Sequence, residues 1–365
     1  MAQTRVCITI DVEFDIAGTF ANPDRCTPIG PASVKCLVNG AEVGLGFILN
    51  TLENFGLRGV FFIETLNTHY FGAGPMGDIA KEISRRGHDL GLHLHPVWTL
   101  FLDANWSEVA KRQSIDSAVY DSMAALQPQE AKALIQYGLE MFSHWGLPQP
   151  SAVRAGGLMA GHEVYQAMAD LNLPLASNIG YAIYRTKECS LHLYTGRHWV
   201  DGVMEIPVTS YIDFGWGRLA HWKLLTITGA GTSETRSVLS SARRTGTDPV
   251  VILTHSNEYF YRAPNEHGEA RVNELTHQRL TDLCSYLRDH SDRFSVTTFR
   301  EQSDAWRMEG ETPNSRIRVT PWAAVHRLYE NRISDIVARR HDRKSREMDL
   351  HINSADESRP LGKDR

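Results

Sequence analysis

The chain has few cysteines, no long apolar run and no large excess of charge of one sign, and each absence excludes a class of protein. Its five cysteines are odd in number and widely spread, and no two of them form a C-x-x-C pair; they are Cys7, Cys26, Cys36, Cys189 and Cys284. This usage is typical of reduced thiols rather than of a disulfide framework or a zinc ribbon. No apolar run approaches the roughly 18 residues that a membrane-spanning helix needs, so we expect no membrane span.

The net charge bears on the expected binding partners, and the N-terminal residues bear on the expected cellular compartment. The formal charge is −5 over 365 residues, and the first 310 residues contain no long block of one sign. Without a basic face, nucleic acid is not an expected partner. The N-terminal stretch MAQTRVCITIDVEFD has neither the positive segment nor the long apolar segment of a signal peptide, so we expect a cytoplasmic protein.

Short β-rich runs alternate with helical patterns along the chain, and most connections are too long for hairpins. Strands are expected at 5–11, 57–64, 88–95, 151–156, 173–178, 249–255 and 294–299, helices at 41–56, 77–87, 115–145, 161–172, 233–244 and 270–289, and a hairpin at 199–208. This order is typical of parallel strands covered by helices. The fold class is therefore α/β, and about seven βα units favour a barrel.

Ionisable side chains stand at the carboxyl ends of four of these strands. They are Asp11 and Glu13 after the first strand, His93 and His95 at the third, Arg154 at a later strand and His255 at the late apolar strand. The carboxyl ends of parallel strands meet at one edge of a sheet or barrel, where loops carry the chemistry. We therefore expect all six side chains on the same rim.

The stretch GHDLGLHLHPVW places three histidines within eight residues. Residues two apart on a strand share a face, so His93 and His95 can converge, and so can Asp11 and Glu13. Two imidazoles and one carboxylate are enough protein ligands for a catalytic divalent ion. Zinc is favoured, and cobalt or nickel could replace it. His88 lies an odd number of steps from the histidine pair, so we expect it to face away and to be structural.

The chain resembles the polysaccharide deacetylases, the NodB-homology domains of carbohydrate esterase family 4, over roughly residues 5–300. TIDVEFD is similar to the family's first motif, GHDLGLHLHP to its second, VRAGG to its third and ILTHS to its last, in the same order along the chain. The resemblance implies an irregular (β/α)7-type barrel. It also implies a hydrolase that removes an N-acyl group, above all an N-acetyl group, from a sugar or sugar-like substrate.

The resemblance implies a role for each residue of the rim. These roles are a divalent metal site of Glu13, His93 and His95, and a catalytic group of Asp11 as base, His255 as acid and Arg154 as the side chain that steadies the base. In such a site the metal activates water and stabilises the oxyanion. The acid then protonates the departing amine.

The chain departs from the family's motifs in three places. The second metal histidine usually lies four residues after the first, at the position of Val97, whereas here the second imidazole is His95. Val12 stands where an adjacent aspartate is usual, so Glu13 supplies the carboxylate ligand. LASN places Ala176 where another acid is usual. These changes are typical of an outlying branch.

Further residues near the motifs are expected to contact the substrate. They are Trp98, Gly156, Gly157, Tyr211, Asn257 and Glu258. The aromatic rings could stack on a sugar, with packing in the core as the alternative. The glycines leave room beside the arginine of the third motif, and the last two residues directly follow the histidine of the last motif.

The character of the chain changes beyond residue 310. The stretch 320–340 begins with an N-cap threonine and a proline at the first helical position, and its apolar spacing predicts an amphipathic helix. Its apolar stripe either docks on the chain's own barrel or forms a contact between two copies. We therefore expect a catalytic domain at 1–310, a helical extension at 311–340 and a charged, disordered tail at 341–365.

Three functions fit these observations. The first is a metal-dependent amide hydrolase that acts on an N-acylated sugar, as a small or lipid-linked substrate. The second is a deformylase or another C–N hydrolase with a different amide substrate. The third is a catalytically inactive NodB-like module that binds a glycan. A substrate panel separates the first two, and metal analysis with hydrolysis tests separates both from the third.

Overall fold

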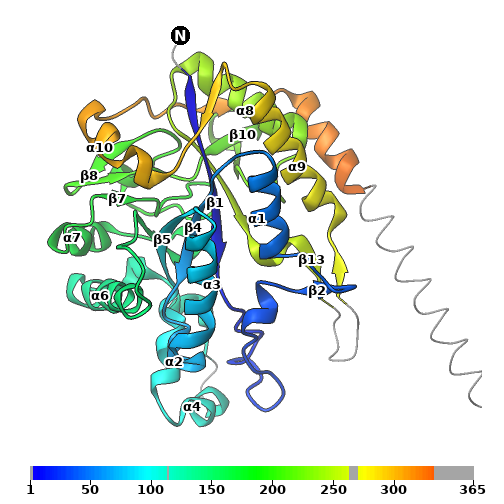
Figure 1. Ribbon diagram of the computed structural model, residues 1–365. Coiled ribbons are helices and arrows are strands. Elements are labelled where there is room, and N and C mark those ends of the chain that lie inside the picture. The colour runs from blue at the N-terminus through cyan, green and yellow to red at the C-terminus, as the bar shows by residue number, and fades with distance from the viewer. Residues whose placement is uncertain (1–2, 113–114, 263–269, 333–365) are drawn as a thin grey trace, which may run out of the picture.

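The structure of the chain is a computed structural model that describes residues 3–112, 115–262 and 270–332. A nine-stranded sheet curls into a half-barrel, and helices surround it (Figure 1). The strands lie in the order β12-β1-β4-β5-β6-β7-β9-β8, and β15 pairs with the first part of β1. This is the α/β class with the irregular (β/α)7-type barrel that the sequence predicts. The tail at 341–365 lies outside the described residues.

The strands of this sheet are parallel to their neighbours except for one antiparallel pair, β8 and β9. Their bounds are β1 (Thr4–Val12), β4 (Val60–Glu64), β5 (Asp89–Leu94), β6 (Val153–Ala155), β7 (Leu175–Ala176), β8 (His198–Val200), β9 (Val203–Glu205), β12 (Val250–His255) and β15 (Phe294–Val296). The antiparallel pair confirms the hairpin predicted at 199–208. Its turn residues Asp201 and Gly202 have φ of 47° and 85°, which is typical of a two-residue hairpin turn.

Helices fill the connections between the strands. Their bounds are α1 (Leu45–Asn54), α2 (Thr68–Phe71), α3 (Ala73–Arg85), α4 (Trp106–Arg112), α5 (Ser117–Tyr120), α6 (Pro128–His144), α7 (His162–Asp170), α8 (Thr232–Thr245), α9 (Glu274–Asp289) and α10 (Phe299–Glu309). Among the described residues, none of the helices is long and apolar enough to cross a membrane.

Several predicted elements have other bounds in the structure, and the physical reason is clear for three of them. The helix predicted at 41–56 begins at Leu45, because β3 (Ala41–Glu42) pairs with β2 (Leu37–Val38). The helix predicted at 115–145 is broken, because Pro128 cannot lie inside a helix and instead starts α6. The strand predicted at 294–299 ends at residue 296, because the side chain of Thr298 accepts a hydrogen bond from a backbone N–H and so caps α10.

The alternation of side chains along the strands separates two layers of the core. On β1, Val6, Ile8 and Ile10 belong to the large cluster that packs against the helices. Cys7 points to the opposite side and belongs to a smaller cluster with residues of β4, β7, β9 and β12. Because side chains alternate strictly along a strand, the same inner side carries Asp11 at the carboxyl end of β1. The inner face of the half-barrel is therefore apolar at depth and polar at the rim.

The C-terminal helix is described over 321–332 and lies against α8 and β10 (Ser210–Phe214) through its polar side chains. Arg327 is only 7% exposed, whereas Val325 and Leu328 are 52% and 61% exposed. The helix therefore docks on the chain's own barrel, as one of the two alternatives expects, but the predicted apolar stripe faces outward. The physical reason is that buried carboxylates of α8 and β10 bind the arginine of this helix and turn its apolar side outward. A small sheet of β11 (His221–Leu224), β10 and β16 (Ile317–Arg318) leads into it.

Candidate functional site

Neighbouring strands bring the predicted rim residues side by side. Asp11, near the end of β1, is the register partner of His255 at the end of β12. Further along the same sheet, on the side of β1 away from β12, His93 of β5 is the register partner of both Glu64 of β4 and Arg154 of β6. Residues more than 200 positions apart in the sequence therefore meet at one rim because the strands that carry them end at the same level.

Arg154 fixes Asp11 in place. The arginine is fully buried, and its Nη1 donates a hydrogen bond of 2.6 Å to Asp11 Oδ1. Its other donors bind the backbone oxygen and the hydroxyl of Ser177, at 3.1 and 2.8 Å, and its guanidinium lies 3.9 Å from the centre of the Phe62 ring. Asp11 is thus held through one oxygen. Its second oxygen, Oδ2, faces the histidines, 3.9 Å from His93 Nε2 and 3.8 Å from His255 Nε2.

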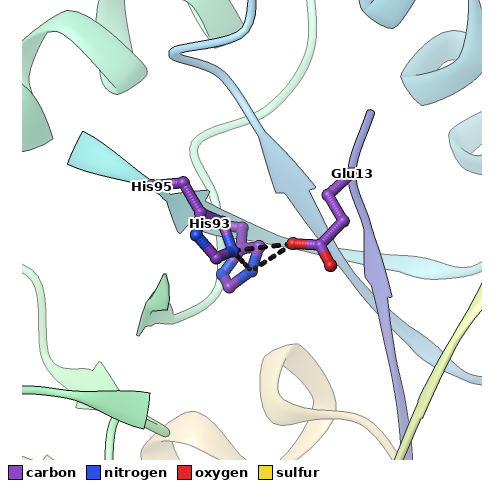
Figure 2. A group of neighbouring side chains, drawn as sticks. All are labelled: Glu13, His93 and His95. Carbon is purple, nitrogen blue, oxygen red and sulfur yellow. Dashed lines mark hydrogen bonds and ion pairs between the residues drawn. The ribbon is translucent and has the colours of Figure 1, made fainter. Parts of the chain in front are cut away.

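The three predicted metal ligands form a compact group (Figure 2). Glu13 extends from the end of β1 toward the imidazoles of His93 and His95, which project from the end of β5. Glu13 Oε2 lies 2.7 Å from His95 Nε2 and 3.4 Å from His93 Nε2, and the two Nε2 atoms are 3.1 Å apart. The separations of 3.1 and 3.4 Å suit ligand atoms around one ion, whose bonds from zinc to nitrogen are about 2.0–2.1 Å long, and the 2.7 Å contact is an ion-pair distance.

Each histidine has its Nδ1 occupied by an acceptor. Nδ1 of His93 donates to the backbone oxygen of Arg154 at 2.9 Å, and Nδ1 of His95 donates to Asp121 Oδ2 at 2.6 Å. In a neutral imidazole the other nitrogen then carries a lone pair. Two lone pairs and the carboxylate of Glu13 therefore point at one place, and a cation satisfies all three. These residues fit a divalent metal ion, and the hydrogen bonds at Nδ1 are of the kind that orients metal-binding histidines in proteins.

The charges of this group shift its proton affinities. Burial alone lowers the pKa of His95, but the carboxylates of Glu13 and Asp121 outweigh burial and hold that pKa well above its ordinary value. Burial alone raises the pKa of Glu13, but the neighbouring histidines outweigh it and hold that pKa well below its usual range. A proton on His95 and a metal ion therefore compete for the same nitrogen, so metal binding must release a proton.

His255 reaches the same place from the opposite strand. Its Nδ1 lies 3.3 Å from Glu258 Oε1, and its Nε2 lies 3.9 Å from Glu13 Oε1. Burial alone lowers the pKa of His255, but the hydrogen bond to Glu258 and the nearby carboxylates outweigh it and raise the pKa to about 9. His255 is therefore protonated at neutral pH, as a proton donor must be.

Glu258 is predicted as a substrate contact, and the structure gives it a different place. Its carboxylate turns inward on the turn η7 (Ser256–Tyr259) and accepts hydrogen bonds from the hydroxyls of Thr254 and Thr228, at 2.8 and 3.0 Å. It also accepts the backbone N–H of His255 at 3.1 Å. Its oxygens are thus occupied by the protein, and it orients His255 instead of pointing into a cleft.

The two aromatic substrate contacts predicted from the sequence are core residues. Trp98 is 1% exposed and packs against Phe71 and Phe101, because it lies on η2 (Pro96–Leu102), which folds back beneath the rim. Tyr211 is fully buried, with its hydroxyl donating to Glu234 at 3.3 Å, because its side of β10 faces α8. Neither ring offers a face to a sugar, so this prediction is wrong and the alternative of core packing holds.

The two glycines of the third motif also leave less room than predicted. A Cβ on Gly156 would lie 2.5 Å from Nδ1 of His95, so the space beside this glycine belongs to the imidazole and not to a substrate. Gly157 has φ of 58°, a left-handed backbone that favours glycine, and a Cβ there would lie 2.8 Å from Met159 Cε. Asn257 is exposed next to His255 and stays a predicted substrate contact.

The structure adds residues that the sequence reasoning missed. Asp121 binds His95 but lies between α5 and the turn η3 (Met123–Ala125), where no periodic pattern marks it. Glu64 is the last residue of β4, and its position at the carboxyl end of a strand is a signal that the sequence does contain. It is fully buried, its Oε1 accepts the backbone N–H of Leu66 at 2.7 Å, and burial raises its pKa to about 8. His88 lies apart from the cluster, buried and accepting the N–H of residue 59, as the sequence predicts.

A cleft opens beside the candidate metal centre, on the side of His95. It encloses about 750 Å³, open solvent at its mouth included. Asp121, which binds His95, forms part of its wall, and the loop after β1 forms the opposite wall. Its wall exposes polar and apolar surface in nearly equal amounts; the lining residues are Asp15, Ile16, Ala17, Gly18, Phe20, Ala21, Val97, Ile115, Ser117 and Asp121.

Comparisons with known proteins place the fold. No protein-family model matches the chain, and no curated protein sequence matches it significantly. A solved structure described as a polysaccharide deacetylase from Mycobacterium smegmatis is similar, with a TM-score of 0.53 and 17% identity over 88% of this chain and 96% of that one. A family 4 carbohydrate esterase from Streptomyces lividans, in complex with acetate, has a TM-score of 0.40 and 12% identity over 86% and 98%.

A third similar structure is a family 4 acetyl xylan esterase from Clostridium thermocellum in complex with a cobalt ion, with a TM-score of 0.39 and 13% identity over 82% and 91% of the two chains. At these identities, structural similarity speaks for the fold and not for the chemistry. The mycobacterial structure is matched over nearly its whole length. The chain therefore has the NodB-homology fold of the polysaccharide deacetylases.

Proposed function

We propose that the chain is a metal-dependent hydrolase that removes an N-acyl group, an acetyl group above all, from a sugar or sugar-like substrate. The observation that supports this proposal is that three potential metal ligands lie beside the carboxylate of Asp11, which Arg154 holds in place, and the imidazole of His255. Glu13 Oε2 lies 2.7 Å from His95 Nε2, and Asp11 Oδ2 and His255 Nε2 lie within 4 Å of each other beside it. Amide hydrolysis needs such a combination of an electrophile, a base and an acid.

The metal group in this proposal consists of Glu13, His93 and His95. When bound, a divalent ion such as zinc, or cobalt or nickel in its place, polarises the acyl carbonyl and lowers the pKa of water. Three protein ligands are the number found in catalytic zinc sites, which keep further positions free. Asp121 and the backbone oxygen of Arg154 turn the two imidazoles toward the ion.

The proton transfers belong to the residues on either side of that group. Asp11 would accept at Oδ2 a proton from the water that adds to the acyl carbonyl, because its Oδ1 is occupied by Arg154 at 2.6 Å. His255 delivers a proton from Nε2 to the departing amine, because its Nδ1 is held by Glu258. Arg154 keeps Asp11 oriented and leaves Oδ2, the oxygen that accepts the proton, free of a hydrogen bond from the arginine. Each transfer is expected to contribute about 10²–10⁴ in rate.

The cleft beside His95 is the proposed place of the sugar. Its apolar wall residues suit the faces of a sugar ring and an acetyl methyl group, and Asn257, two residues after His255 in the sequence, is exposed. The carboxylates of Asp15 and Asp121 in the wall disfavour an anionic ring. We therefore propose a neutral N-acylated amino sugar, small or lipid-linked, as the substrate class, with the activity in residues 1–310.

The test separates catalysis from metal binding. Asp11→Asn and His255→Ala are expected to keep the metal and the fold while losing most release of acetate from N-acetylated amino sugars. His162→Ala, which removes a partly exposed histidine paired with Asp201 outside this site, is the matched control and keeps full activity. A panel that includes N-formylated sugars and non-sugar amides identifies the acyl group.

One outcome would replace this function with the binding-module alternative. In that outcome the wild-type chain releases no acid from any amide tested. It also binds a glycan with an affinity that Asp11→Asn and His255→Ala leave unchanged.

A further inference from the structure

The helix at 321–332 docks on the body of the protein through charges. Arg327 donates to Asp213 Oδ2 at 3.1 Å and lies 3.2 Å from Glu234 Oε1, and both carboxylates are buried. One turn later, Glu330 Oε2 accepts from Arg279 Nη2 of α9 at 2.8 Å. Charged groups buried in this way need partners in a fixed geometry, so these ion pairs set the rotation of the helix about its axis.

This rotation leaves the apolar side of the same helix facing outward. Trp322, Val325, Leu328 and Tyr329 are 81%, 52%, 61% and 65% exposed. An amphipathic helix on a globular protein normally buries this stripe and exposes its charges. Here only the small Ala323 and Ala324 are buried beside Arg327, whereas the larger apolar side chains are exposed, and a contiguous exposed patch of this kind marks an interaction site.

We propose that this apolar face of helix 321–332 binds the same face of a second copy of the chain, in a two-fold symmetric homodimer. In a two-fold dimer one patch serves both sides, so the patch must complement itself. The helix offers both parts that self-complementarity needs. The rings of Trp322 and Tyr329 are mostly exposed, and together with Ser233, Thr320 and Ala323 they line a groove.

The exposed area suits a dimer of moderate strength. Large aromatic side chains present about 150–250 Å² each, so the four exposed side chains together offer roughly 500 Å². Two copies would then bury roughly 1,000 Å², which is about the smallest area of a specific protein interface.

The rest of the chain has little with which to cover this face. Residues 341–365 are mostly charged and polar, with few apolar residues. The groove residue His326 lies 3.0 Å from Glu330 Oε1, so the edge of the patch is polar, as the rim of a protein interface is. A bilayer is a weaker candidate, because interfacial helices carry an excess of Lys and Arg on their polar side, whereas Arg327 here is neutralised by two carboxylates.

The first experiment measures self-association of the full chain by sedimentation equilibrium over a series of concentrations. We expect a monomer–dimer equilibrium that the double variant Val325→Glu, Leu328→Glu weakens by more than about tenfold, because charges then face each other across the interface. The matched control is Met308→Glu, which changes an 83% exposed methionine on α10 and should leave the equilibrium unchanged. Thermal unfolding of all variants confirms that each is folded.

The second experiment locates the contact. In a Cys189→Ser background, which removes an exposed native thiol, Leu328→Cys should be joined to itself by a short bis-maleimide, and Met308→Cys should not. A wild-type chain that is monomeric at every concentration overturns the proposal. A dimer that the double glutamate variant leaves intact also overturns it, as does a chain that binds phosphatidylcholine–phosphatidylglycerol vesicles through this face without self-associating. None of these outcomes depends on the hydrolase activity, so the two proposals can fail separately.

Discussion

Glu13 faces two imidazole nitrogens, and the two rings are turned toward it by partners of different kinds. His93 is oriented by the backbone oxygen of Arg154, which no side-chain substitution removes. His95 is oriented by the side chain of Asp121, at 2.6 Å. The orientation of one ligand is therefore built into the sheet, whereas the other depends on a single carboxylate from an irregular loop.

Substitution of that carboxylate is the first prediction at this scale. Asp121→Ala removes the acceptor of His95 Nδ1, so the ring is free to rotate and to change its tautomer. Zinc affinity should fall by about 10–100-fold, as it does when such outer contacts are removed from metal sites. Competition titration with a zinc chelator measures the change. Asp78→Ala, at an exposed site on α3, is the matched control, and an Asp121→Ala variant with wild-type affinity would contradict the role given to this residue.

A second prediction concerns pH and the pair of His255 and Glu258. The pKa of His255 is raised to about 9, against about 6.5 for an unperturbed histidine, so its acid form persists through neutral pH and is lost as pH rises through about 9. Glu258→Gln removes the charge of the hydrogen-bonded partner, and the pKa should fall. The alkaline limb of the rate–pH profile should therefore move to lower pH.

The acidic limb provides the internal control for that measurement. It depends on groups that Glu258→Gln does not contact, because Asp11 is held by Arg154 on the neighbouring strand. The acidic limb should stay in place while the alkaline limb moves. If both limbs of the Glu258→Gln profile coincide with those of the wild type, the carboxylate does not control the acid.

At the scale of elements, the strands that carry the site could be predicted from the sequence, and the loops around it could not. β1, β4, β5 and β12 each lie within one residue of the predicted bounds at their carboxyl ends, because buried parallel strands are continuous apolar runs. Asp121 lies among short helices and turns that share no period. The aromatic residues Trp98 and Tyr211 were predicted near a ligand because sequence alone does not show which side of an element faces the core.

The turn η4 (Gly156–Leu158) supplies a prediction for an element. Gly156→Ala adds a methyl group that would lie 2.5 Å from His95 Nδ1, with the ring atoms as its nearest contacts. The imidazole must move away, so metal content and activity should fall, while the unfolding midpoint of the metal-free variant should stay close to that of the metal-free wild type. Metal analysis and thermal unfolding measure the two effects. Gly74→Ala, on α3 with no atom within 4 Å of the new methyl group, is the matched control.

At the scale of the whole molecule, the site is a junction between distant parts of the chain. Residues 11, 93, 154 and 255 come from the four strands β1, β5, β6 and β12. In the sheet, β1 and β4 lie between β12 and β5. An ion held by Glu13, His93 and His95 links the end of β1 to the end of β5 across β4. Binding to this arrangement requires the folded sheet, since the ligands are 80 residues apart in the unfolded chain.

This linkage predicts that metal removal lowers the stability of the whole fold. A ligand that binds only the folded state at a hundred times its dissociation constant adds about 2.7 kcal/mol to the free energy of unfolding. The melting temperature should therefore fall when a chelator removes zinc. The shift should shrink as pH falls through the raised pKa of His95, because the proton then competes for Nε2. The double variant His93→Ala, His95→Ala should melt at the same temperature with and without zinc; if zinc raises its melting temperature as much as that of the wild type, the ion that stabilises the fold binds elsewhere.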